Sequence, residues 1–112
     1  MTIHCSIKGL APTDELERYA RRRVNRLRRS LPRKLRADAD CQVILTRTTH
    51  AGVKQNTCTI VFVVNGGNAS FSATESTQHI HAALDIVVVR IERELKLYTH
   101  GRRRGFFRIV RD

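Results

Sequence analysis

The stretch "RYARRRVNRLRRSLPRKLR", from Arg18 to Arg36, carries ten of the 21 basic residues of this 112-residue chain. Thr13 can cap a helix that enters this stretch, because the acidic residues that follow it suit the positive end of a helix dipole. Pro32 disfavours helical geometry in the residue before it, so we expect the helix to end there. Apolar residues recur along it every three or four positions and trace one buried stripe: Leu16, Ala20, Val24, Leu27 and Leu31.

Strands are predicted on both sides of this helix. Residues 2–8 alternate between apolar and polar side chains, which is the two-residue period of a strand. The segments "DCQVILTRT" (residues 40–48) and "TCTIVFVVN" (57–65) are rich in β-branched residues and also read as strands. We expect the segment between them, "THAGVKQN" (49–56), to be a loop.

The second half of the chain is predicted to contain a hairpin and another helix. Asparagine and glycine tolerate the positive φ angles of a tight turn, so "NGG" at Asn65–Gly67 indicates a hairpin into the strand "NASFSAT". A second helix is expected to start near Ser76 or Thr77. It carries apolar residues at helical spacing: Ile80, Leu84, Val87, Val88, Ile91 and Leu95.

The predicted order is therefore β-α-β-β-β-α, an α+β fold. The first helix forms a crossover that places the first two strands parallel, whereas hairpins join the remaining strands antiparallel. Two amphipathic helices must bury their stripes, so we expect a four-stranded mixed sheet with both helices on one face. Residues 1–100 are expected to form one domain, and residues 101–112 a basic, aromatic C-terminal tail.

The composition favours an anionic partner. The formal net charge is +11, hydrophobic residues make up 41% of the chain, and seventeen of the basic residues are arginine. The charge is thus mounted on a folded domain rather than on a disordered tail. Arginine grips phosphate through two parallel hydrogen bonds and stacks on bases, which favours nucleic acid over a membrane surface. A merely solubilising surface is the alternative.

The first helix is predicted to present its arginines to solvent. With Ala20 at the centre of the buried face, the 3.6-residue turn points Arg18, Arg22 and Arg29 directly away from the core. Arg23 and Arg26 lie on one flank. The only acidic residues of the helix are in its first turn, so few intrahelical ion pairs can relieve the repulsion between the arginines. This face is expected to bind a polyanion.

The second helix and the tail add further candidate contacts. Arg90, Arg93 and Lys96 lie on the second helix among acidic neighbours, and they could line one groove with the first helix if the two pack side by side. The tail combines three consecutive arginines with a pair of phenylalanines, a composition suited to phosphate contact and base stacking. We expect a disordered arm that orders on RNA, and the alternatives are an extra strand or a site for another protein. The tail arginines are Arg102, Arg103 and Arg104.

Other classes of function receive little support. Cys5, Cys41 and Cys58 show no CxxC spacing, so we expect free thiols rather than disulfides or a zinc site. His79 and His81 are two residues apart, which on a helix does not bring them together around a metal. Catalytic motifs, signal sequences and apolar spans of membrane length are absent from the sequence. We therefore expect a cytoplasmic, non-enzymatic protein without cofactor or metal.

Strand order, helix phase, the turn "VVNGG" (Val63–Gly67) and "AALD" (Ala82–Asp85) together resemble the ribosome hibernation promoting factor family over residues 2–98. That family includes ribosome-associated inhibitor A and was once labelled a sigma-54 modulation protein. The resemblance implies a double-stranded-RNA-binding-domain-like fold. It also implies binding to the small ribosomal subunit, in the channel used by messenger and transfer RNA, during stress or stationary phase. RNA-facing roles carry over to matching basic positions of the two helices, Arg23, Arg26, Arg90 and Arg93.

The sequence departs from the family pattern at two places. His79 and His81 stand where short members often carry Asp and Tyr, and "LYTHGRRR" replaces lysines after the second helix. The C-terminal dimerisation domain of the long members is absent from the sequence. Whether the chain would promote or oppose ribosome pairing is left open.

The leading hypothesis is a factor that binds small-subunit ribosomal RNA and blocks translation sterically. The expected partners are the small subunit and its ribosomal RNA, with no small-molecule substrate and no membrane, and the protein is expected to be monomeric off the ribosome. A general binder of structured RNA or DNA is the first alternative. A regulator that binds another protein through its tail is the second.

Overall fold

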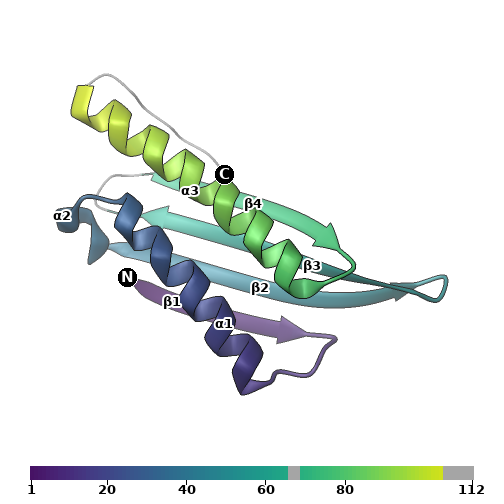
Figure 1. Cartoon of the computed structure of the whole chain (residues 1–112). Coiled ribbons are helices and arrows are strands. Elements are labelled where there is room, and N and C mark those ends of the chain that lie inside the picture. Colours follow the sequence, from purple (N-terminus) through teal and green to yellow (C-terminus); the bar gives the residue numbers. More distant parts are fainter. Residues whose placement is uncertain (66–68, 105–112) are drawn as a thin grey trace.

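The computed structural model describes residues 1–65 and 69–104, which form a four-stranded sheet covered on one face by helices. Figure 1 shows α1 and α3 lying on the same face of the sheet. The strands follow the order β1-β2-β3-β4, with β1 parallel to β2 and the other pairs antiparallel. The predicted α+β fold is confirmed. Its elements are β1 (Thr2–Lys8), α1 (Asp14–Asn25), the 3₁₀ helix η1 (Arg26–Ser30), α2 (Arg33–Arg36), β2 (Ala39–His50), β3 (Val53–Val64), β4 (Ala69–Thr77) and α3 (Ile80–Arg104).

The crossover from β1 to α1 depends on one glycine and one threonine. Gly9 has a φ of +78°, and a Cβ atom there would lie 2.2 Å from the carbonyl oxygen of Arg47. Only glycine fits both the positive φ and this close approach. Thr13 then caps α1, its Oγ1 accepting the backbone N–H of Leu16 at 3.2 Å. The chain therefore turns from the sheet layer into the helix layer within a few residues.

The core lies between the sheet and the helices. Along each strand alternate residues face the helices, as the pairing of Ile3, Cys41, Phe62 and Phe71 across the four strands shows. The apolar stripes of the helices close over these rows, and Tyr98 packs edge-on against Phe71 with ring centroids 5.6 Å apart. Each fully buried aliphatic or aromatic side chain contributes about 1.5–3 kcal/mol relative to exposure.

The first helix differs from the continuous α-helix expected up to Pro32. The α-helical geometry ends at Asn25, and the chain tightens into η1 over the next five residues. Leu31 is extended, with φ −109° and ψ 147°, as expected for a residue that precedes proline. A 3₁₀ turn is a frequent ending for such helices because it satisfies the last carbonyl groups over a shorter length. Leu27 and Leu31 remain buried, so the apolar stripe was predicted correctly although the helix type was not.

The loop expected over residues 49–56 was wrong, because the two strands continue into a tight hairpin. β2 runs to His50 and β3 starts at Val53. The two connecting residues, Ala51 and Gly52, have φ of 52° and 79°. Positive φ at both central residues is the geometry of the two-residue turns that match strand twist. In Figure 1 this hairpin extends past the ends of the other strands.

The start of the second helix was placed too early. β4 continues to Thr77, because Ser76 and Thr77 pair with the start of β3 and the Ser76 and Thr57 hydroxyls are hydrogen-bonded at 2.7 Å. α3 begins at Ile80 and runs to Arg104. The boundary expected between residues 100 and 101 therefore falls inside this helix. The turn at Gly66 and Gly67 lies outside the described residues.

The outer face of the sheet is almost free of charge. Pairing places four rows of residues on it, and Lys8 and Asp40 are the formally charged residues in these rows. Hydroxyl side chains predominate, and some bond to each other, as do Thr59 and Thr74 at 3.0 Å. The rows are Thr2, Asp40, Val63 and Ser70; His4, Gln42, Val61 and Ser72; Ser6, Ile44, Thr59 and Thr74; and Lys8, Thr46, Thr57 and Ser76.

Candidate nucleic-acid interface

The solvent-facing side of α1 and η1 is a row of arginines, here called the open arginine face. It consists of Arg18, Arg22, Arg26 and Arg29, all exposed. Among the side chains of residues 1–65 and 69–100, none forms an ion pair with any of the four. Like charges at this spacing repel each other, so the face is destabilising until an anion neutralises it. Helical spacing predicted that Arg18, Arg22 and Arg29 point away from the core, whereas it placed Arg26 on the flank with Arg23.

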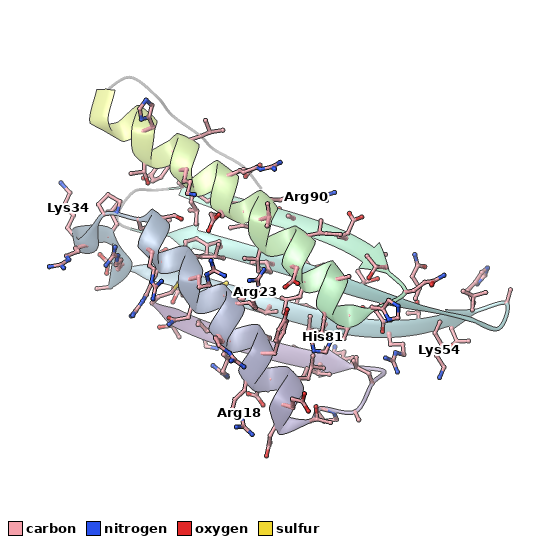
Figure 2. All side chains as sticks on the ribbon, in the orientation of Figure 1. Arg18, Arg23, Lys34, Lys54, His81 and Arg90 are labelled. Atoms are coloured by element: carbon pink, nitrogen blue, oxygen red, sulfur yellow. The ribbon has the colours of Figure 1, made fainter. Side chains whose placement is uncertain are left out.

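The flank of α1 that faces α3 is an interhelical seam rather than an open surface. The Arg23 Nε lies 2.9 Å from Asp85 Oδ1, and the Tyr19 hydroxyl donates to the same oxygen at 2.8 Å. The His81 ring packs edge-on against Tyr19 with centroids 4.5 Å apart. The Arg23 side chain is only 25% exposed. Figure 2 shows Arg23 and His81 between the two helices.

Arg23 was expected to contact RNA, but in the structure it also holds α1 against α3. Asp85 neutralises part of its charge and holds it against α3. Burial, and secondarily the hydrogen bond to Asp85, raises the pKa of Tyr19, which keeps the hydroxyl protonated as the donor. Asp85 ends the "AALD" segment, so this segment positions α1 against α3.

Arg90 lies away from α1. Its Nη1 is 3.0 Å from Glu75 Oε2 and donates to the carbonyl oxygen of Thr74 at 3.2 Å, so it covers the free edge of β4. Figure 2 shows Arg90 on the side of α3 away from α1. Arg21 acts similarly at the opposite edge, donating from Nη1 to the carbonyl oxygen of Ile3 at 3.2 Å. Arg90 therefore does not line a groove between the helices.

The remaining predicted contacts are dispersed along α3. Arg93 is exposed, and Lys96 is exposed with its Nζ 3.5 Å from Glu92 Oε1. The side chains of Arg102, Arg103 and Arg104, in the last turn of α3, lie outside the described residues, as do Phe106 and Phe107.

A basic groove that the sequence did not indicate lies where η1 and α2 meet α3. It has a volume of about 530 Å³ and opens beside a second hollow of about 270 Å³, with which it shares Arg29, Ser30 and Thr99. The helical period gave no signal for it, because the extended Leu31 and Pro32 reset the phase before α2. The cationic or titratable residues that line the two hollows are Arg29, Arg33, Lys34, Arg36, Lys96 and His100.

The three cysteines are free thiols, and Cys41 and Cys58 are buried. Within residues 1–65 and 69–104, no group of three His, Cys, Asp or Glu side chains could hold a metal ion. Burial raises the pKa of Cys41 and of Cys58 to about 12, so both remain protonated thiols near neutral pH. No helix of the described residues is long and apolar enough to cross a membrane.

The chain was compared with protein families, curated sequences and solved structures. The family described as sigma 54 modulation protein / S30EA ribosomal protein matches residues 3–103. No curated protein sequence matches the chain. The fold is shared with several solved structures, among them the following two. The N-terminal domain of Protein Y from Thermus thermophilus superposes with a TM-score of 0.70 at 23% identity, over 88% of this chain and 99% of that one. A ribosomal subunit interface protein from Coxiella burnetii gives 0.68 at 14% identity, over 89% and 99%.

Proposed function

The chain belongs to the sigma-54 modulation protein / S30EA ribosomal protein family, and from that membership we propose that it is a ribosome-associated translation inhibitor. It lays the open arginine face on ribosomal RNA of the small subunit, in the channel of messenger and transfer RNA, and excludes them sterically. It acts in the cytoplasm during stress or stationary phase. The names of the two similar structures, a Protein Y domain and a ribosomal subunit interface protein, agree with this role.

The observation that carries the proposal is the open arginine face. From Arg18 to Arg29 it spans about 18 Å, taking a rise of about 1.5 Å per residue in α1 and about 2 Å in η1. That length allows several phosphates to be contacted together. Because among the described side chains these guanidinium groups have no acidic partner, RNA binding costs no internal ion pair and relieves repulsion.

In the proposed complex, electrostatic attraction supplies most of the affinity and shape supplies the specificity. Neutralising phosphates releases condensed counterions, and engagement of about six phosphates predicts a slope of about −4 to −5 for the logarithm of affinity against the logarithm of salt concentration. Such contacts carry no sequence information. Specificity then comes from the fit between the rigid helix layer and a folded RNA surface.

The other basic residues extend the interface to different degrees. Arg93 and Lys96 are exposed on α3, and we propose that they and the tail arginines make peripheral contacts. Arg23 and Arg90 already hold Asp85 and Glu75. Their contribution to RNA binding is therefore smaller than that of the open arginine face.

Cosedimentation with small subunits tests the proposal. Substitution of Arg22, Arg26 and Arg29 by glutamate should abolish cosedimentation at a salt concentration where the wild-type protein binds, while circular dichroism remains unchanged. Undiminished binding of a folded variant would contradict the role of this face. Displacement of the wild-type protein by a plain RNA duplex at equal nucleotide concentration would indicate a general duplex binder instead.

A further inference from the structure

The basic groove beside the open arginine face has the size of a small-ligand site. Its volume of about 530 Å³ falls within the range of about 300–1,000 Å³ that is typical of pockets for small organic ligands. The adjoining hollow of about 270 Å³ shares Arg29, Ser30 and Thr99 with it and extends it along α3. A groove of this size accommodates a nucleotide unit, whereas the convex cylinder of a duplex can touch only its rim.

The lining of the groove selects for negative charge. None of the residues that line either hollow is acidic. Arg29, Arg33 and Lys34 make no ion pair with the described side chains of residues 1–65 and 69–100, and Arg33 and Lys34 line the groove with their side chains exposed to solvent. The basic residues come from three elements, η1, α2 and α3, so they approach a ligand from different directions.

The groove is held in shape before any ligand arrives. The Arg36 Nε donates to the carbonyl oxygens of Arg28 at 2.9 Å and Leu31 at 3.1 Å, which fixes α2 against η1. The Thr99 hydroxyl donates to the carbonyl oxygen of Ser30 at 2.8 Å and fixes α3 against the same turn. Buried Leu35 anchors α2 from below. A groove that is already ordered loses little entropy when it binds.

We propose that this groove binds the phosphates of a sharply turned, unpaired RNA strand, next to the paired or irregular RNA that meets the open arginine face. This inference rests on the proposed function and adds a distinct subsite to it. Unpaired strands bend enough to insert one nucleotide and its flanking phosphates, and bidentate arginine contacts favour such phosphates. The open arginine face, being convex, accepts both paired and unpaired RNA.

Two charge-matched double variants and two RNA probes test the subsite. The groove variant is R33E/K34E, and the control is R18E/R22E on the open arginine face. Glutamate is compatible with the first turn of a helix, so the groove variant should fold, and its thermal midpoint checks this. Fluorescence anisotropy is measured with a short unstructured RNA and with an RNA duplex of equal length.

The groove variant should lose about tenfold in affinity for the unstructured RNA and less than about threefold for the duplex, because two contacts that the duplex cannot reach are removed. The control should lose affinity for both probes alike. Equal losses for both probes in the groove variant, no loss for either, or the same selectivity in the control would overturn the subsite. Displacement of the unstructured RNA by a nucleoside triphosphate at equal phosphate concentration would assign the groove to free nucleotides and overturn the RNA assignment.

These measurements need no ribosome, which separates the subsite from the proposed function. If the wild-type protein fails to cosediment with small subunits while the groove variant still discriminates between the probes, the ribosomal role is wrong and the subsite stands. If cosedimentation depends on the open arginine face but the groove variant shows no discrimination, the subsite is wrong and the ribosomal role stands.

Discussion

The two faces of this molecule treat polar groups in opposite ways. On the outer face of the sheet, hydroxyl groups bond to each other across strands, as in the pairs Thr57–Ser76 and Thr59–Thr74, and charge is nearly absent. On the helix layer, the arginines of the open face have no acidic partner among the described side chains. The proposed RNA-binding surface is therefore the face whose charges are left unpaired, not the face with the most polar groups.

Substitutions that change the charge equally on the two faces provide the strongest test of this contrast. Thr48 is exposed and lies on the same outer face of β2 as Thr46, opposite Gln55 of β3. R18Q/R22Q/R29Q and T2E/Q42E/T48E each lower the net charge by the same amount. The first should weaken small-subunit binding roughly a thousandfold, because each hydrogen-bonded contact to a charged group contributes about 1.5 kcal/mol. The second should change it less than about threefold. Cosedimentation at several salt concentrations measures both, and similar losses would show that only net charge matters.

The turn that joins the sheet layer to the helix layer is predicted to lose stability when Gly9 is replaced. Alanine there must adopt a positive φ, and its Cβ must avoid the carbonyl oxygen of Arg47 that lies 2.2 Å from the ideal position. We expect G9A to lose about 3 kcal/mol in free energy of unfolding. Urea denaturation measures the loss, with G52A as the control, because a Cβ at Gly52 meets nothing within 4 Å and only the positive φ remains unfavourable. Equal losses in the two variants would contradict the role of the close approach.

Two buried thiols on the helix-facing side of β2 and β3 are predicted to make stability depend on pH. Cys41 and Cys58 are fully buried, and burial raises the pKa of each from 9.0 to about 12. Between pH 9 and pH 12 the two thiols lose their protons in the unfolded chain but keep them in the folded chain, so rising pH favours the unfolded state. Stability should therefore be unaffected below about pH 9 and fall above it by about 1.4 kcal/mol per pH unit for each thiol.

Urea midpoints measured on both sides of this pH check the prediction. The C41A variant loses stability at every pH through its cavity, but its decline with pH should be about 1.4 kcal/mol per unit shallower than in the wild type. An identical decline in the two proteins would show that other groups dominate the alkaline limb.

The smallest predicted effect lies inside the helix layer. Y19F removes the hydroxyl that donates to Asp85 but leaves the ring beside His81. We expect a loss of about 1 kcal/mol in stability and no change in RNA affinity, because Arg23 still pairs with Asp85 and the open arginine face is untouched. Thermal unfolding and anisotropy measure the two quantities. A large loss of RNA affinity would mean that the seam itself contacts RNA.

Much of this architecture was predictable because most helices and strands have a recognisable local pattern of apolar residues. The stripe from Leu16 to Leu31 required a helix with one buried side, and the alternation in residues 2–8 required a strand. Connectivity then left few arrangements of the sheet. The hairpin at Ala51 and Gly52 was missed because alanine rarely adopts a φ of 52°, and polar strand ends that project beyond the sheet look like a loop.

The candidate site was predictable only where it follows a single helix. The open arginine face is set by the period of α1, so Arg18 and Arg22 could be placed without coordinates. The pairing of Arg23 with Asp85, and of Arg90 with Glu75, joins elements far apart in the chain. The basic groove likewise depends on three elements meeting after the break at Pro32. Helical periodicity carries no information about contacts between elements that are distant in the sequence.

The arginines at the two sheet edges have a consequence for self-association. Each outermost strand offers backbone carbonyls that a strand from another molecule could use to extend the sheet. Here Arg21 already occupies the Ile3 carbonyl and Arg90 the Thr74 carbonyl. A competing strand must displace a guanidinium group and insert beside a fixed positive charge. The residue type that forms the proposed RNA-binding face therefore also discourages edge-to-edge aggregation.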